Sequence, residues 1–236
     1  VQPVSSNENT SLTISMENEA DCPRYIGGIV KNVQVGPSPE WIVERLKASG
    51  QRSINNIVDI SNYVLLEMGH PTHIFDYEAL GKKQIHVRRA KKGESLTTLD
   101  EKNHTLDDTH LLITDGKSPV ALAGVMGGLD SAVSDTTTTV LVESAYFNPV
   151  AIRKSAKSLA MSTDASKRFE RGADPDGCLP SFWRVISMLK EFAGGELISG
   201  MVDQYPNPIK MASILMRRSE LDLILGIAIV KNEVDR

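Results

Sequence analysis

Apolar and polar residues follow a regular pattern along the first third of the chain, and this pattern predicts strands followed by helices. Apolar residues alternate over 12–17 and form a second stretch over 25–35, which favours two strands. A helix is expected over 38–50, because a serine and a proline suit its first turn and a glycine suits its end. A second helix ends at Gly69. Its apolar residues, which share one face, are Ile57, Ile60, Val64, Leu65 and Met68.

The pattern changes over 84–145, where short apolar segments alternate with turn residues. This spacing predicts hairpin connections at 100–103 and 115–116 and buried strands over 119–126 and 140–145. Helices are expected to begin at 148–149, 164 and 180, and a last strand is expected over 196–205. Because strands and helices do not alternate regularly, we expect an α+β fold with a central mixed, largely antiparallel sheet flanked by helices.

Composition narrows the class of protein without indicating a chemistry. The chain has 236 residues, 41% hydrophobic and 24% charged, so disordered, collagen-like and coiled-coil classes are excluded. No apolar run approaches the roughly 18 residues of a membrane span, so no membrane association is expected. Cys22 and Cys178 leave room for one bridge but favour reduced thiols. We therefore expect a soluble, globular, cytoplasmic protein.

The chain is slightly acidic overall but basic in two segments. Twenty-six Lys and Arg residues against 30 Asp and Glu residues give a net charge of −4, which does not by itself indicate a nucleic-acid binder. Basic residues nevertheless gather over 82–92 and 153–171. In each segment they either contact phosphate groups or form a solvated face.

Two histidines and an aspartate at three-residue steps, His70, His73 and Asp76, are candidate metal ligands. Pro71 disfavours the helix that would bring the two imidazoles together. Zinc sites need three or four protein donors, and no second cluster of donors accompanies these residues. We expect no metal here. The alternatives are a structural loop histidine or a histidine that orients water and polar substrate atoms.

A glycine-rich segment and a carboxylate in an apolar run are the other candidates. Residues 124–128 (GVMGG) lack the dinucleotide-binding pattern. The backbone N–H groups of Gly127 and Gly128 can approach a ligand closely, or these glycines form a tight turn with positive φ. Glu143 is either exposed on one face of a strand or buried beside donors or a ligand hydroxyl. No pattern of a cysteine or serine hydrolase accompanies them.

Five segments occur in an order and at spacings that resemble the editing module of the phenylalanyl-tRNA synthetase beta subunit family. They are RSINNIVDISNYV (52–64), GHPTHIFD (69–76), AGVMGG (123–128), Glu143 with Asn148 and Pro149, and STDASKRFERGADP (162–175), which is the most specific. The tail from Arg217 resembles the start of that family's next, small DNA-binding-like domain. We therefore expect a piece of a larger chain, with a lead-in strand over 1–24, the editing domain over 25–206, and a linker with a truncated next domain over 207–236.

The resemblance implies a function and a set of partners. The family's enzyme is an alpha2beta2 heterotetramer whose alpha chain makes phenylalanyl-tRNA with ATP and Mg²⁺. Both cofactors are therefore expected for the complete synthetase, and none for this fragment. The module itself is expected to hydrolyse tyrosine that is wrongly attached to the 3′ end of tRNA(Phe). The alternative is a non-catalytic scaffold or tRNA-docking module of the same synthetase.

Matching positions imply roles for individual residues. The resemblance makes His73 the editing-site histidine and Glu143 its acidic partner. The other implied site residues are Gly127 and Gly128 in the loop against the substrate, Thr163 and Ala165 in the pocket wall, and Asn55 and Asn56 at the approach to the tRNA end. Tyrosine exceeds phenylalanine by one hydroxyl, so the pocket has to discriminate by a hydrogen bond, with Glu143 as the expected acceptor. A positioned water and backbone N–H donors suffice for an ester, so no covalent nucleophile is expected.

Overall fold

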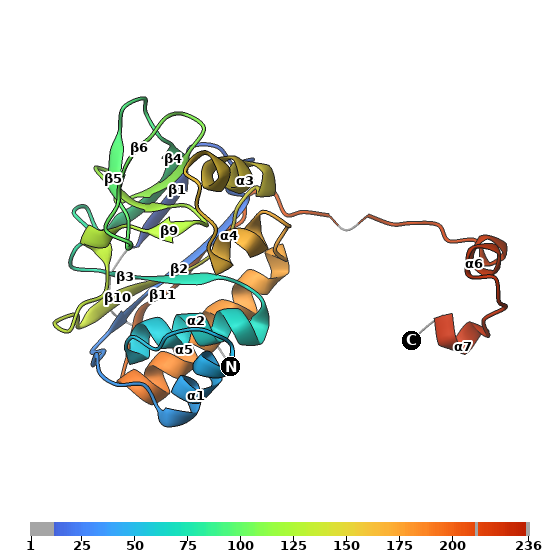
Figure 1. Ribbon diagram of the computed structural model, residues 1–236, viewed down its shortest axis with the longest axis horizontal. Helices are drawn as coiled ribbons and strands as arrows, with labels where there is room; N and C mark the ends of the chain where they lie inside the picture. The colour runs from blue at the N-terminus through green and yellow to red at the C-terminus, as the bar shows by residue number, and fades with distance from the viewer. Residues whose placement is uncertain (1–11, 211, 235–236) are drawn as a thin grey trace.

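The computed structural model describes residues 12–210 and 212–234, most of which form two β-sheets with helices packed around them (Figure 1). Residues 1–11 of the predicted lead-in lie outside the described part of the chain. A four-stranded antiparallel sheet has the order β11-β2-β10-β3. Its strands are β2 (Arg24–Lys31), β3 (Thr72–Asp76), β10 (Thr139–Tyr146) and β11 (Glu196–Gln204).

The second sheet is five-stranded, with the order β1-β4-β7-β8-β9; β1 and β4 are parallel and the other neighbours antiparallel. Its strands are β1 (Thr13–Met16), β4 (Gln84–Arg89), β7 (Leu111–Thr114), β8 (Pro119–Leu122) and β9 (Met126–Gly127). A separate hairpin consists of β5 (Ser95–Thr97) and β6 (Asn103–Thr105). The predicted α+β class is confirmed, and its strands are divided between two main sheets.

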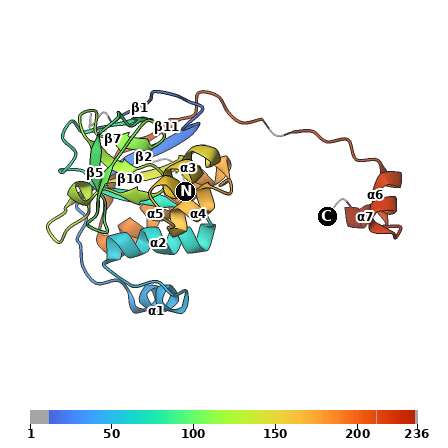
Figure 2. The same cartoon turned by 45° about the horizontal axis from the view of Figure 1, so that its top comes forward.

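Helices cover the outer face of the four-stranded sheet and one end of the molecule (Figure 2). The sheet contacts α2 (Asn56–Met68) and α5 (Cys178–Ala193), and α1 (Glu40–Ala48) packs on α2. At the other end, α3 (Pro149–Ser158) packs on α4 (Asp164–Phe169). Two 3-10 turns cover Leu129–Ser131 and Pro175–Gly177. Beyond β11 the chain extends away to α6 (Arg218–Leu225) and α7 (Lys231–Val234). None of the described helices is long and apolar enough to cross a membrane.

The helix ends follow the signals in the sequence. Asn148 caps α3 by accepting from the N–H groups of the second and third helical residues, and Gly69 ends α2 in the left-handed conformation. Pro180 lies in the first turn of α5, which begins two residues earlier at Cys178, because a missing N–H is harmless there. Met68, predicted to share a face with the apolar residues of α2, is 42% exposed, since it ends the helix at its solvent-exposed tip.

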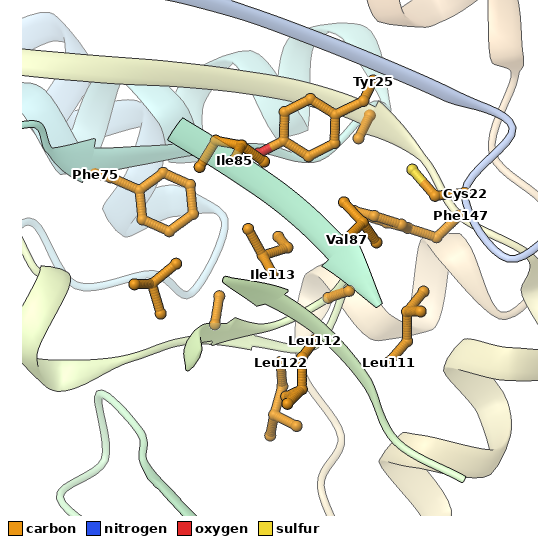
Figure 3. Packing of buried hydrophobic residues seen from close by; sticks show 14 of the residues in the cluster. Cys22, Tyr25, Phe75, Ile85, Val87, Leu111, Leu112, Ile113, Leu122 and Phe147 are labelled. Atoms are coloured by element: carbon orange, nitrogen blue, oxygen red, sulfur yellow. The ribbon is translucent and has the colours of Figure 1, made fainter. Parts of the chain in front are cut away.

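Successive residues of β2 and β10 point to opposite faces of the four-stranded sheet, and both faces are covered. Tyr25 and Leu141 belong to the core between the two sheets, part of which is shown in Figure 3. Ile26 and Val142 belong to the core under the helices. Burial on both sides explains the uninterrupted apolar pattern of these strands. It also places Glu143 on the face that points toward the five-stranded sheet.

Candidate functional site

Strand pairing brings the two central candidates together. In the antiparallel ladder between β3 and β10, His73 lies directly opposite Glu143. Directly opposed residues share a face and hold their Cβ atoms about 5 Å apart. On its other side Glu143 is opposite Gly27 of β2, so the acid is flanked by a glycine and a histidine in one row across the sheet.

A small cavity opens beside this row, between the two sheets and α4. It offers about 60 Å³ of space to water-sized molecules, enough for a few of them. Apart from His73 and Glu143, its walls are mainly apolar or backbone atoms. The other lining residues are Pro71, Thr72, Ile113, Ala121, Leu122, Gly124, Val125, Met126, Gly127, Ala165 and Phe169. An apolar cavity with a few convergent polar groups is typical of a site for a small organic group.

Glu143 is the acidic group of this cavity and is only 5% exposed. Its Oε2 accepts a hydrogen bond of 2.6 Å from the hydroxyl of Tyr25. Burial raises the pKa of Glu143 to about 7, and the Tyr25 hydrogen bond opposes this shift. The thiol of Cys22 is also buried nearby; its pKa is raised by burial and then by the charge of Glu143. Cys22 and Cys178 are both buried and free.

His73 is a half-buried imidazole whose ring packs edge-to-face on Phe75, with 4.4 Å between the ring centroids. Desolvation lowers its pKa to about 4. The ring is therefore neutral at physiological pH and presents one donor and one acceptor nitrogen. Such a ring can orient a water molecule or a ribose hydroxyl, and its low proton affinity makes it a weak base.

The two glycines of the loop are required for different reasons. A Cβ atom on Gly127 would lie 2.6 Å from Cε1 and 2.8 Å from Nε2 of His73, so glycine lets the backbone approach the imidazole. A Cβ atom on Gly128 would lie 2.5 Å from the carbonyl oxygen of Val120. Gly128 donates its N–H to that same oxygen at 2.8 Å and does not line the cavity with Glu143. Positive φ occurs instead at Gly124, at +65°.

The helix α4 forms one wall of the cavity and is fixed by a capping box. Thr163 accepts from the N–H of Ser166, and the Ser166 hydroxyl accepts from the N–H of Thr163. The Thr163 hydroxyl also donates to the carbonyl oxygen of Val125 at 2.8 Å. Thr163 thereby ties α4 to the glycine loop, while Ala165 contributes its small side chain to the wall.

Asn55 and Asn56 lie away from the cavity lining, at the start of α2. Asn55 caps the helix by accepting from the N–H of Val58 at 3.0 Å. Asn56 is buried, donates to the carbonyl oxygens of Gln34 and Phe192, and accepts from a backbone N–H. Both side chains hold the local fold, and their assignment to the tRNA approach remains a prediction.

The three candidate metal ligands point to different neighbours. His70 is buried with its ring edge-to-face on Phe169, whereas Asp76 accepts from the Thr137 hydroxyl at 2.6 Å. His73 faces the cavity. Over residues 12–210 and 212–234, no group of three or more His, Cys, Asp or Glu side chains is placed to hold a metal ion.

Tyr25 is the residue of this site that sequence reasoning missed. Its place in the apolar stretch 25–35 indicates a strand but gives no sign of a polar role. Its partner Glu143 is far away in the sequence, and only the pairing of β2 with β10 brings the two together. A tyrosine hydroxyl on an otherwise apolar strand is the one signal that could have prompted a search for a partner.

Exposed basic side chains lie around α4, the helix that contributes Ala165 to the cavity. They are Arg153, Lys154 and Lys157 on α3, Lys167 on α4 and Arg171 just after it. In the other basic segment, Arg88 and Arg89 form ion pairs of 2.6 and 2.5 Å with acidic side chains. The ion pairs of Lys167 and Arg168 with Asp164 are longer, at 3.9 and 4.0 Å. Because its pairs are looser and α4 lines the cavity, the segment 153–171 is the better candidate for contact with phosphate groups.

The fold and the site together define a known class of domain. Residues 21–194 match the family model of the B3/4 domain, and the chain belongs to this family. The curated relatives are phenylalanine–tRNA ligase beta subunits. The chain is 45% identical to that of Protochlamydia amoebophila over 227 residues and 47% identical to that of Geobacter sulfurreducens over 222 residues. These alignments cover 96% and 94% of this chain and 28% of each relative.

A solved structure has the same fold at low sequence identity. It is an N-terminal fragment of the phenylalanyl-tRNA synthetase beta subunit from Pyrococcus horikoshii, with a TM-score of 0.54 and 12% identity. The match covers 99% of this chain and 65% of that fragment. The resemblance to the beta subunit family is thus confirmed, and the chain spans about 28% of the length of the curated relatives it matches.

Proposed function

We propose that this chain is the editing module of a phenylalanine–tRNA ligase beta subunit and hydrolyses the ester of tyrosine attached to tRNA(Phe). The observation that carries the proposal is the row in which Glu143 and His73 face one apolar cavity. An apolar cavity suits an aromatic ring, and a single buried carboxylate suits the one hydroxyl that distinguishes tyrosine from phenylalanine. A phenylalanine ring in the same place leaves the second oxygen of the carboxylate, the one not bonded to Tyr25, desolvated and unpaired.

Hydrolysis of the ester needs a placed water and stabilisation of the developing negative charge. The water oxygen attacks the carbonyl carbon and the bond to the ribose oxygen breaks. One proton of the water ends on the ribose oxygen, and the other is lost to solvent from the carboxyl group of the released amino acid. Neutral His73 orients the water or the ribose, because its pKa of about 4 makes it a poor proton acceptor. Gly127 is the candidate backbone donor to the oxyanion, since the N–H of Gly128 is occupied by Val120.

The remaining assignments belong to the complete enzyme. We propose an alpha2beta2 assembly in the cytoplasm, in which ATP and Mg²⁺ serve the alpha-chain site and this module needs neither. The basic side chains of 153–171 support docking of the tRNA acceptor end beside α4. A module that docks tRNA without cleaving the ester is the competing function.

The test compares deacylation of tyrosyl-tRNA(Phe) and phenylalanyl-tRNA(Phe) by the complete synthetase. We expect rapid loss of tyrosine with phenylalanine spared, a slower rate for His73→Ala, and reduced selectivity for Glu143→Ala. Glu44→Ala, which removes an exposed carboxylate on α1, is the matched control and should change neither quantity. Binding of tRNA without loss of either amino acid would support the docking function instead.

A further inference from the structure

A buried tyrosine lies behind the carboxylate of Glu143. Tyr25 is opposite Ala145 in the β2–β10 ladder. Because Glu143 lies two residues before Ala145 on β10, Tyr25 and Glu143 point to the same face of the sheet. The Tyr25 hydroxyl donates to Oε2 at 2.6 Å, and neither side chain is more than 5% exposed. Tyr25 does not line the cavity, so its hydrogen bond reaches the carboxylate from within the core.

The two oxygens of Glu143 are therefore not equivalent. Oε2 is occupied by Tyr25. Oε1 has no hydrogen-bond partner in the part of the chain that the structure describes. Some side-chain atoms there are fully enclosed and lack a partner, but Oε1 is not one of them. Because Glu143 lines the cavity, Oε1 is the oxygen that a ligand can reach.

We propose that Tyr25 is a positioning and specificity-determining residue: it holds the Glu143 carboxylate in its acceptor form and leaves Oε1 as the single acceptor for the hydroxyl of a tyrosine substrate. The inference rests on the proposed function, because it concerns the same cavity. The buried hydrogen bond to Oε2 opposes rotation of the carboxylate, which favours the orientation in which Oε1 faces the ligand. Selectivity then depends on a group that does not touch the substrate.

The protonation states of the groups around Glu143 make the role of Tyr25 measurable as a pH dependence of selectivity. The groups that face it are Tyr25 and Cys22 on the β2 side and His73 on β3. Burial raises the pKa of Tyr25 and of Cys22 well above their usual values, and the pKa of His73 is about 4. All three are thus neutral near pH 7, whereas burial places the pKa of Glu143 at about 7. The Tyr25 hydrogen bond favours the ionised form, so its loss shifts the titration upward.

The experiment measures the ratio of tyrosyl to phenylalanyl deacylation rates in the complete synthetase between about pH 6 and pH 8.5, corrected for uncatalysed hydrolysis. In the unmodified enzyme we expect the ratio to rise with pH, with a midpoint near 7. Tyr25→Phe keeps the ring and removes only the hydroxyl. We expect its midpoint to rise by about one unit, with a roughly fivefold lower ratio at pH 7.

Tyr63→Phe is the matched control, because Tyr63 is also buried but its hydroxyl bonds Arg45 and Glu67 on the helical side. The pH midpoint of the deacylation ratio in Tyr63→Phe should equal that of the unmodified enzyme. Glu143→Gln should give a ratio that no longer depends on pH, with or without Tyr25→Phe, because no ionisable group is left at this position. A pH-dependent ratio in Glu143→Gln would overturn the assignment of the titrating group to Glu143.

Each outcome decides between the two proposals. An unmodified enzyme that discriminates, together with a Tyr25→Phe variant of unchanged midpoint, overturns the role of Tyr25 and leaves the proposed function intact. An unmodified enzyme that spares both esters, or cleaves both equally, overturns the proposed function and the role of Tyr25 with it. A lower melting temperature without a shifted midpoint would assign Tyr25 a purely structural role.

Discussion

Replacing Glu143 with glutamine should change how the stability of the protein depends on pH. The side chain keeps its shape and its ability to accept from Tyr25, but it can no longer ionise. Burial raises the pKa of Glu143 from 4.5 to about 7 in the folded state. The folded protein therefore binds this proton more tightly than the unfolded chain does, and each pKa unit corresponds to about 1.4 kcal/mol.

The sign follows from the direction of the shift. A carboxyl group with a raised pKa contributes its full stability below pH 4.5 and loses it as the pH rises through about 7. Between pH 5 and pH 8 the loss amounts to about 2.5 kcal/mol of unfolding free energy. Buried His70 and half-buried His73 act in the opposite direction. Their pKa values are lowered to about 4, so the stability they contribute above pH 6.5 is lost as the pH falls through 4.

Urea titrations of the unmodified protein and of Glu143→Gln, at several pH values between 5 and 8, isolate the contribution of Glu143 to the unfolding free energy. The two histidines are common to both proteins, so their effect cancels in the difference. We expect Glu143→Gln to gain about 2.5 kcal/mol relative to the unmodified protein as the pH rises from 5 to 8. Unfolding free energies that differ by the same amount at every pH would refute the view that Glu143 is desolvated in the folded state.

Three further substitutions test the walls of the cavity and the fold around it. Gly127→Ala should displace the His73 ring, slow deacylation at least tenfold and cost about 1–3 kcal/mol of unfolding free energy. Gly36→Ala, where a Cβ atom meets nothing within 4 Å, should leave both quantities unchanged. Thr163→Val removes the cap and the bond to the glycine loop; urea titration should show a loss of about 1–2 kcal/mol, and an unchanged midpoint would contradict the capping role. Arg24→Ala removes the buried member of an ion pair with the more exposed Asp203 of β11 and a hydrogen bond to the carbonyl oxygen of Pro175; calorimetry should show a loss of about 2 kcal/mol, whereas a loss below about 0.5 kcal/mol would argue against a stabilising role of Arg24.

Local features of the fold could be predicted from the sequence because their causes are local. Asn148 before Pro149 and the glycine at 69 mark helix ends through backbone hydrogen bonding within a few residues. The hairpin between β5 and β6 follows from the cluster of turn residues that begins at Asp100. The exposure of Met68 could not be predicted, because helical periodicity places a side chain on a face but does not show where the packed surface ends.

The candidate site could be predicted only in part, because its chemistry depends on distant pairing. The sequence pattern of β10 did not show whether Glu143 is buried, because a strand covered on both faces has no polar face that would identify the exposed side. The glycine loop was open to two explanations, and the structure separates them by placing positive φ at Gly124 and close approach at Gly127. The resemblance to a family supplied roles for His73 and Glu143, but no pattern in one sequence could indicate that Tyr25 holds the acid.

The row of Gly27, Glu143 and His73 across three strands has a consequence for how the chain folds. Its members come together only when the loop between residue 27 and residue 143 has closed, and closing a long loop is entropically unfavourable until the sheet is complete. No early hairpin or helix contains both the acid and the imidazole. A nascent or partly folded chain therefore lacks this row of residues, and the proposed esterase activity requires completion of the native topology.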